Sequence, residues 1–241
     1  MSSSGQFKKM LIRLSGFWSE ERNLAVFLGI IILYFFILPS LGSLAGESLT
    51  INFIANLLYS LLLLTGVVAL TRHKLIQTVF AVIVLLVVSV RWGNLVFGGT
   101  LLGGWDIFLS LVASLAFAFV ILGHVYKKGP VTSHRIQGAI AAYLLLAMAF
   151  SLGFFMVEFI IPGSFKHQNQ TILLDDQSWK IFYYYSITTL TTLGYGDITP
   201  IHPVARNLAM IEALVGQLYP AILFARLVSL HIQTGHSKKD E

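Results

Sequence analysis

Cysteine is absent from the 241 residues, which excludes disulfide bonds, thiol catalysis and cysteine-ligated metal sites. Charged residues are scarce, at 11% of the chain against about 25% in soluble proteins. So few charges could not keep a chain of this length dissolved, and the same composition excludes a disordered chain. Apolar residues reach 56%, which favours a protein embedded in a membrane.

Long apolar stretches organise the chain. A helix needs about 20 mostly apolar residues to cross a bilayer, and six stretches approach that length. They are Leu24–Leu44, Ile51–Leu70, Leu75–Val90, Trp105–Tyr126, Gly138–Ile161 and Pro203–Leu230. We therefore expect an all-α membrane protein with six transmembrane helices.

The basic residues predict the orientation of these spans. With a cytoplasmic N-terminus, twelve of the sixteen Lys and Arg residues fall on the cytoplasmic side, as the positive-inside rule requires. Both termini are then cytoplasmic, and we expect the protein in the inner cell membrane. The net charge of +5 becomes a topology signal, with anionic lipid headgroups rather than nucleic acid as the expected partner.

Five divisions of the chain follow from this pattern. We expect an amphipathic cytoplasmic helix over residues 1–23, a four-helix membrane domain over 24–126, a linker over 127–137, a second membrane domain over 138–230 and a short cytoplasmic tail over 231–241. Within the first membrane domain, the glycine-rich stretch Gly93–Gly104 predicts a flexible loop packed on the outer membrane surface.

The segment between the fifth and sixth stretches differs from the rest. Residues 179–191 contain neither Gly nor Pro and suit a half-membrane helix, whereas alternating glycines in Thr192-Leu193-Gly194-Tyr195-Gly196 end it. Such a strip could turn successive carbonyl oxygens to one side, and four copies around an axis would form rings that replace the water around a cation. One strip cannot enclose a pore, so a homotetramer is expected.

The stretch Thr191-Thr192-Leu193-Gly194-Tyr195-Gly196-Asp197 resembles the selectivity filter of potassium channels. From about Gly138 to Leu230 the chain is similar to the pore domain of prokaryotic six-transmembrane potassium channels. The resemblance implies a re-entrant pore helix before the filter, and K⁺ bound at Thr192, Leu193, Gly194 and Tyr195, with Gly196 completing the filter.

The same resemblance implies which residues support the filter. Asp197 would lie behind the outer mouth and bond to an aromatic residue of the pore helix, either Tyr184 or Tyr185, while Thr188 and Thr191 complete the support. Leu193 stands where the family usually has Val or Ile. Thr188 occupies a position where some relatives have a carboxylate, so inactivation that depends on that acid does not carry over.

Gating charges are missing from the four-helix domain. The fourth stretch, Trp105–Tyr126, contains no Lys or Arg, although voltage sensing requires several charges that move across the field. We therefore expect no steep voltage dependence. Residues 231–241 are too few for a ligand-binding domain, which needs on the order of 100 residues.

Two residues could bend the sixth stretch. Gly216 and Pro220 weaken a helix and predict a hinge for an inner gate, with a fixed bend or close packing at Gly216 as alternatives. Glu212, in the same stretch, is expected to hydrogen-bond to the back of the pore helix or to pair with Arg206.

The expected function is passive K⁺ conduction through a tetrameric central pore, with no organic cofactor and no enzyme activity. A regulatory subunit is possible. A non-selective cation channel with a loosened filter and a subunit of a cation transporter stay open as alternatives. The sequence shows no paired inverted halves, which argues against the transporter. It also contains no catalytic His-Glu-x-x-His or Gly-x-Ser-x-Gly motif, which argues against an enzyme.

Overall fold

The computed structural model describes residues 23–45, 49–70, 74–126, 132–168, 170–172, 174 and 178–237. Six of its helices are long and apolar enough to cross a membrane. Those windows are Asn23–Leu41, Thr50–Val67, Leu75–Phe97, Thr100–Val125, Ser133–Ile160 and Pro203–Arg226. Five of the six predicted stretches therefore agree closely with a helix, and the third is longer than predicted.

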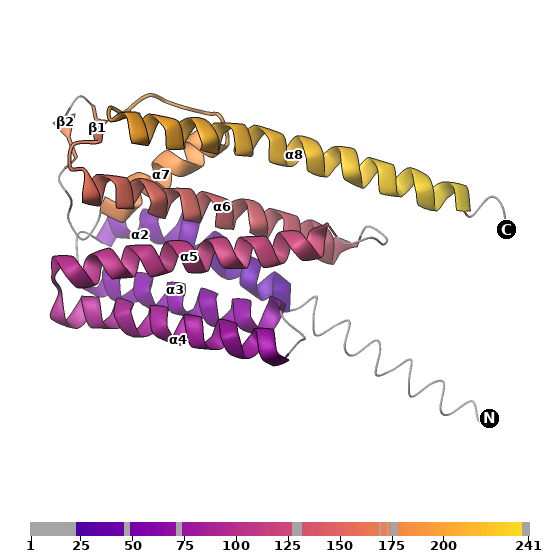
Figure 1. The fold of residues 1–241 in the computed structure, drawn as a ribbon, viewed down its shortest axis with the longest axis horizontal. Helices are drawn as coiled ribbons and strands as arrows, with labels where there is room; N and C mark the ends of the chain where they lie inside the picture. Colours follow the sequence, from indigo (N-terminus) through magenta and orange to yellow (C-terminus); the bar gives the residue numbers. More distant parts are fainter. Residues whose placement is uncertain are drawn as a thin grey trace.

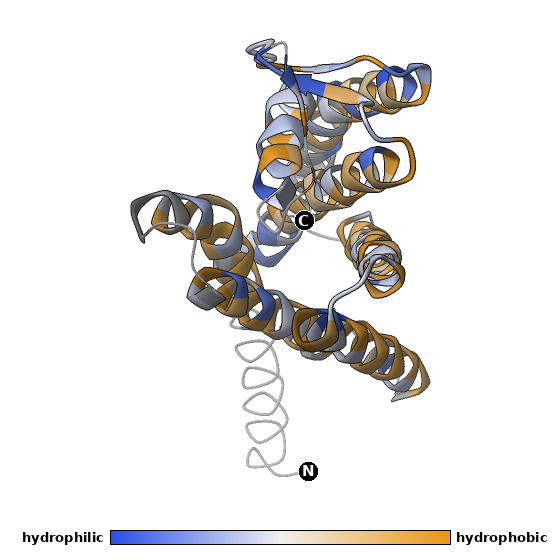
Figure 2. Ribbon diagram, turned by 90° about the vertical axis from the view of Figure 1, so that its left-hand side faces the viewer, coloured by the Kyte–Doolittle hydropathy of each residue, from blue (hydrophilic) through white to orange (hydrophobic). Residues whose placement is uncertain are grey.

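The helices lie alongside one another, and their ribbons are mostly hydrophobic (Figures 1 and 2). The first span is helical from Asn23 and contains the π-helical turn η1 (Leu33–Ile37), which leads into α2 (Leu38–Ala45). The remaining helices are α3 (Leu49–Leu70), α4 (Lys74–Phe97), α5 (Thr100–Val125), α6 (Ser133–Ile160), α7 (Ser178–Leu190) and α8 (Pro203–Ser237).

Pro39 explains the π-helical turn in the first span. Proline has no N–H group, and its ring clashes with the carbonyl four residues earlier, here that of Phe35. The widened turn over Leu33–Ile37 lies just before this proline, and π-helical structure occurs mostly as such single-turn bulges inside α-helices. The Ser40 hydroxyl then donates to the Phe36 carbonyl at 2.9 Å.

The predicted loop Gly93–Gly104 is wrong. Helix α4 continues to Phe97 and α5 begins at Thr100, so the connection is only Gly98–Gly99. The predicted third span ends at Val90, immediately before Arg91. In the structure Arg91 lies inside α4 and pairs with Asp106 of α5 at 3.3 Å, which lowers the cost of keeping the charge in an apolar helix.

Three other boundaries also differ from the sequence prediction. The helix α6 begins at Ser133, inside the predicted linker 127–137, because Thr132 caps its first turn by accepting a hydrogen bond from the Arg135 amide. Helix α8 continues to Ser237, through much of the predicted tail 231–241. The amphipathic helix predicted over residues 1–23 lies, except for Asn23, outside the described residues.

A small antiparallel sheet corrects the all-α prediction. Its strand order is β2-β1-β3, with β1 at Phe165–His167, β2 at Gln170–Thr171 and β3 at Ile198–Pro200. Strand β1 comes from the loop after α6, whereas β3 precedes α8, and His167 pairs with Ile198. The fold is therefore mostly helical, with a sheet that joins the two ends of the α6–α8 connection.

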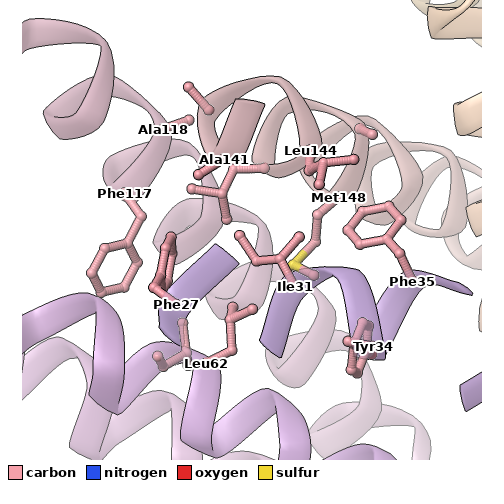
Figure 3. Close-up of a cluster of buried hydrophobic side chains, with 14 of the residues drawn as sticks. Phe27, Ile31, Tyr34, Phe35, Leu62, Phe117, Ala118, Ala141, Leu144 and Met148 are labelled. Atoms are coloured by element: carbon pink, nitrogen blue, oxygen red, sulfur yellow. The ribbon is translucent and has the colours of Figure 1, made fainter. Parts of the chain in front are cut away.

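One apolar core joins the first span to α3, α5 and α6. Figure 3 shows Phe27 and Ile31 facing Phe117 of α5 and Ala141 of α6, and all four side chains are buried. A Cβ atom on Gly138 would lie 3.2 Å from Val125, so α5 and α6 approach closely. The four-helix domain therefore packs against α6 of the same chain.

Candidate functional site

The end of α7 carries an unusual loop. The Thr191 hydroxyl donates to the Ile187 carbonyl at 2.7 Å, which satisfies part of the last helical turn. The amides of Leu193 and Gly194 then both donate to the carbonyl of Thr188, at 2.8 and 3.1 Å. The chain is thereby folded back over the C-terminal end of α7, where the helix dipole is negative.

The backbone after this turn alternates in conformation. Thr192, Gly194 and Gly196 have φ angles of +59°, +51° and +79°, while Leu193 and Tyr195 between them do not have positive φ. A Cβ atom on Gly194 or Gly196 would meet nothing within 4 Å. Glycine is therefore needed at these two positions for its left-handed conformation and not for space.

The strip 192–196 is exposed along one side. The side chains of Leu193 and Tyr195 are 55% and 68% exposed, and α8 also presents an uncovered apolar face. That face is formed by Val204, Met210, Ile211, Leu214, Leu218, Ile222 and Phe224. A backbone strip without regular hydrogen bonds is tolerated at membrane depth only where protein buries it or it lines a wet cavity.

Asp197 ties the end of the strip to its surroundings. Its carboxylate accepts a side-chain hydrogen bond from Tyr184 of α7 and a second from the amide of Ile198 at 3.0 Å. Its backbone carbonyl accepts from the Gln168 amide at 2.8 Å. The ring of Tyr184 also stacks on that of Tyr195, with centroids 6.4 Å apart.

The two candidate aromatic partners of Asp197 therefore lie in different environments. Tyr185 instead packs edge-on against Phe154 of α6 and Phe165 of β1, with centroids 4.8 and 5.4 Å away. The hydroxyl of Thr188 donates to the Tyr185 carbonyl within α7 at 2.9 Å. Tyr184 is thus the residue of this pair beside Asp197, and Tyr185 anchors α7 to the rest of the fold.

Gly216 lies against the end of α7. A Cβ atom placed on it would be 1.9 Å from the carbonyl oxygen of Leu190, which also accepts a hydrogen bond from Tyr143 of α6 at 3.1 Å. Pro220 lies within the continuous helix α8. Next to it, the Tyr219 hydroxyl donates to the Ala139 carbonyl at 2.7 Å. This hydrogen bond joins this part of α8 to α6.

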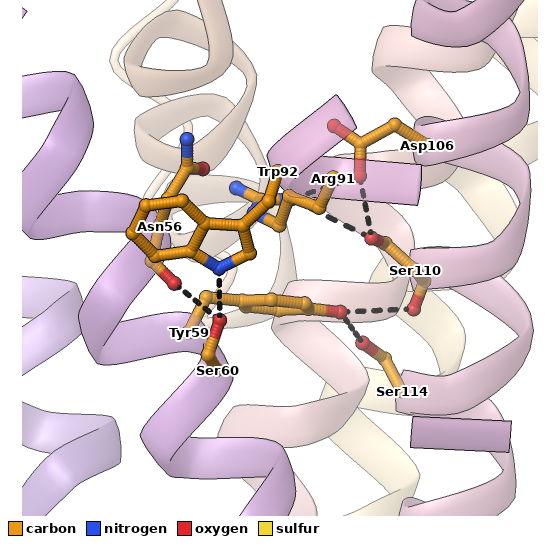
Figure 4. Close-up of polar contacts among 8 residues, drawn as sticks. All are labelled: Asn56, Tyr59, Ser60, Arg91, Trp92, Asp106, Ser110 and Ser114. Carbon is orange, nitrogen blue, oxygen red and sulfur yellow. Dashed lines mark hydrogen bonds and ion pairs between the residues drawn. The ribbon is translucent and has the colours of Figure 1, made fainter. Parts of the chain in front are cut away.

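A polar cluster in the four-helix domain was not predicted from the sequence. Figure 4 shows Arg91 beside Asp106 and Ser110, with Tyr59 beneath. The guanidinium lies 4.4 Å from the centre of the Tyr59 ring, and the Tyr59 hydroxyl donates to the Ser110 carbonyl at 3.2 Å. Tyr59, Arg91 and Asp106 of this cluster line a cavity of about 570 Å³ that reaches Trp179 and Tyr183 of α7.

One signal in the sequence could have located this cluster. Gly98–Gly99 is a strong turn signal, and Arg91 and Asp106 are equally distant from it along the chain. Two antiparallel helices joined there place the two residues at the same level.

Among the residues that the structure describes, no group of three or more His, Asp or Glu side chains could hold a metal ion.

Comparison with known proteins relates this geometry to a family. Residues 142–233, which include α7, the strip and most of α8, match the family described as Ion channel. The chain is 31% identical to Protein LctB of Bacillus caldotenax over 136 residues, which cover 50% of this chain and 92% of that protein. No solved structure matches the chain.

Two further relatives match over shorter segments. Protein LctB of Geobacillus stearothermophilus is 33% identical over 87 residues, 32% of this chain and 60% of that protein. Potassium channel K2 of Plasmodium falciparum is 30% identical over 97 residues, which are 40% of this chain and only 6% of that much longer protein.

Proposed function

This chain belongs to the family of Protein LctB and contains an ion channel domain over residues 142–233, and on this basis we propose that it conducts K⁺ passively across a membrane. The pathway is a central pore between four copies of the chain. The filter residues are Thr192, Leu193, Gly194, Tyr195 and Gly196. The similarity to Potassium channel K2 supports potassium as the ion.

The alternating backbone of the strip carries this proposal. Left-handed angles at Thr192, Gly194 and Gly196 separate residues of the ordinary hand, a pattern in which successive carbonyl oxygens can face one side. Four such strips would offer stacked rings of oxygens that replace the hydration shell of K⁺. The Tyr184–Asp197 hydrogen bond supports the strip from behind.

The exposed side of one chain supports a homotetramer. Leu193 and Tyr195 are more than half exposed, and the backbone of the strip would face lipid in a lone subunit, which membrane proteins avoid. Neighbouring copies would cover these residues. In the same arrangement the C-terminal, electronegative end of α7 faces the axis, where it favours a cation.

The channel's orientation and regulation follow from charge. Both termini are cytoplasmic by the distribution of Lys and Arg, in the inner cell membrane, and these residues favour contact with anionic lipid headgroups. The first four spans contain one Lys or Arg residue, Arg91, which is paired with Asp106. The pore is therefore not steeply gated by voltage.

Potassium flux into proteoliposomes tests the proposal. Purified full-length protein should give a K⁺ flux that is lost in Gly194→Ala and Gly196→Ala, because a side chain at these left-handed angles costs roughly 1–2 kcal/mol in each subunit. Gly123→Ala is the matched control, since a Cβ there meets nothing within 4 Å and its φ is ordinary. Equal flux from all four proteins would refute the filter assignment.

A non-selective cation channel is the second candidate. Leu193, whose side chain is 55% exposed, is the second residue of the strip and could change the packing behind it. In that case the same flux assay would show Na⁺ entering as readily as K⁺, and the Gly194→Ala and Gly196→Ala variants would lose both.

A further inference from the structure

Two glutamates of the second membrane domain are completely buried, and they have different partners. Glu158 and Glu212 both have 0% exposed surface. The two carboxylate oxygens of Glu158 accept hydrogen bonds from the amides of Gly163 and Phe165, at 2.6 and 2.9 Å. Glu212 has one partner, the Ser186 hydroxyl of α7 at 2.5 Å, and its second oxygen has none among the described residues.

Ser186 has two oxygen neighbours and only one proton. Its hydroxyl oxygen lies 2.7 Å from the carbonyl oxygen of Ala147 in α6 and 2.5 Å from the carboxyl oxygen of Glu212 in α8. A backbone carbonyl can only accept, so the serine proton belongs to the bond with Ala147. The contact between Ser186 and Glu212 then needs a proton from Glu212.

We propose that Glu212 is a neutral carboxylic acid, and that the chain of hydrogen bonds from Glu212 to Ser186 to the Ala147 carbonyl positions α7 beneath the filter. This role as a positioning residue rests on the proposed channel function. The proton stays on Glu212, and the same two hydrogen bonds join the helices α8, α7 and α6.

The electrostatics of the site agree with a neutral acid. An ionised carboxylate without a cation is very costly in an apolar interior. Asp106 has such a cation in Arg91, whereas Glu212 takes part in no ion pair among the described residues. Arg206, the nearest basic residue along α8, donates its Nε to the Pro200 carbonyl instead. Protonation leaves only one uncharged oxygen without a donor, which costs far less than a bare charge.

The position of these hydrogen bonds explains their effect on the filter. Glu212 and Gly216 are one turn apart on α8, as are Ser186 and Leu190 on α7, so each residue of α8 faces its counterpart. The Thr188 carbonyl, which holds the amides of Leu193 and Gly194, lies between these two contacts. Loss of the Glu212–Ser186 contact would therefore free the segment of α7 to which the filter strip is attached.

Infrared spectroscopy tests the proton directly. Purified full-length protein in liposomes should show a carbonyl stretch of a protonated carboxylic acid that shifts in D₂O. The band should disappear in Glu212→Gln and persist in Glu158→Gln, the matched control for a buried glutamate. A spectrum in which Glu212→Gln removes no such band would show that Glu212 is ionised and overturn the inference.

Flux measurements test the positioning role. Glutamine has an amide group that can donate to Ser186, so Glu212→Gln should retain K⁺ flux within about twofold, whereas Glu212→Leu and Ser186→Ala should lose about tenfold, the effect of one buried hydrogen bond. The double variant Ser186→Ala with Glu212→Leu should be no worse than either single variant, because both break the same chain. Equal flux from Glu212→Leu and the native protein would overturn the role.

The two experiments separate this inference from the proposed function. Failure of the native protein to conduct would refute the channel proposal, and the infrared band would still decide whether Glu212 carries a proton. If Glu212→Leu does not assemble, Glu212→Gln keeps the test decisive, because loss of flux in that variant would contradict a neutral donor at this position.

Discussion

The carbonyl oxygen of Leu190, the last residue of α7, lies 1.9 Å from the place that a Cβ atom on Gly216 would occupy. No side chain fits there, because α7 backbone atoms and not a movable side chain occupy the space. Close packing, one of the alternatives to a hinge at Gly216, therefore explains this glycine. The contact joins the helix that would line the pore to the helix that carries the filter.

Gly216→Ala should therefore disturb the filter as well as any gate. We expect a loss of K⁺ flux together with weaker discrimination against Na⁺, because α7 must move away from α8 to admit the methyl group. Flux of both ions into proteoliposomes measures this change. Gly123→Ala, where a Cβ has open space, should change neither ion's flux, and unaltered selectivity in Gly216→Ala would favour a simple hinge.

The tyrosines of α7 should differ in their effect on the filter. Tyr184→Phe removes the donor to Asp197 and should shorten the time that the pore stays conducting, by about tenfold if the bond contributes about 1.4 kcal/mol. Tyr185→Phe keeps the ring that packs against Phe154 and Phe165 and should have little effect. Single-channel recordings distinguish them, and identical behaviour would contradict the assigned partner.

The Arg91–Asp106 pair should matter for stability. Each side chain is only 14% exposed, so Asp106→Asn leaves a largely buried guanidinium without its counter-charge and should cost about 3 kcal/mol. Thermal unfolding in detergent measures this loss. The double variant Arg91→Met with Asp106→Leu should recover much of it, because an apolar pair of similar volume carries no desolvation cost; a double variant as unstable as Asp106→Asn would argue against this explanation.

Voltage should have little influence on conduction. Moving one charge across 100 mV is worth about 2.3 kcal/mol. Arg91, the single Lys or Arg of the first four spans, pairs with Asp106 and stacks over Tyr59. In symmetric potassium, we expect open probability to change only slightly between negative and positive potentials. A steep conductance–voltage curve that flattens in Arg91→Gln would show that this arginine moves.

The cytoplasmic end of α8 should be coupled to the four-helix domain. Arg226 donates a hydrogen bond to the carbonyl of Tyr126 at the end of α5, and its guanidinium lies 4.7 Å from the centre of that tyrosine ring. Arg226→Gln should therefore change open probability and leave the ratio of K⁺ to Na⁺ permeability intact. Recordings in which Arg226→Gln and the native channel open equally often would contradict this coupling.

Much of the helical frame was predictable, because a span is a local property of about 20 apolar residues. The exception was α4, which continues past the predicted end at Val90 and through Arg91. Its neutralisation by Asp106 depends on a contact between two helices, which hydropathy along one chain does not contain. The sheet was missed for a related reason: strands of two or three residues, such as Gln170–Thr171, are too short to show an alternating pattern.

The irregular strip at residues 192–196 could be located from the sequence, but its contacts could not. The alternating glycines at Gly194 and Gly196 stand out because their left-handed backbone requires them. By contrast, both Tyr184 and Tyr185 were reasonable partners for Asp197, and only the orientation of α7 separates them. The sequence allows either the back of the pore helix or Arg206 as the partner of Glu212, and Ser186 of α7 is the residue that Glu212 contacts.

The reversal potential of the purified protein in a planar bilayer, with K⁺ on one side and Na⁺ on the other, tests the central claim most directly. A filter of stacked carbonyl rings replaces the hydration shell of K⁺, so we predict a value close to the potassium limit, with Leu193 tolerated in the filter. A value near zero with cation currents present would contradict potassium selectivity and identify a non-selective cation channel.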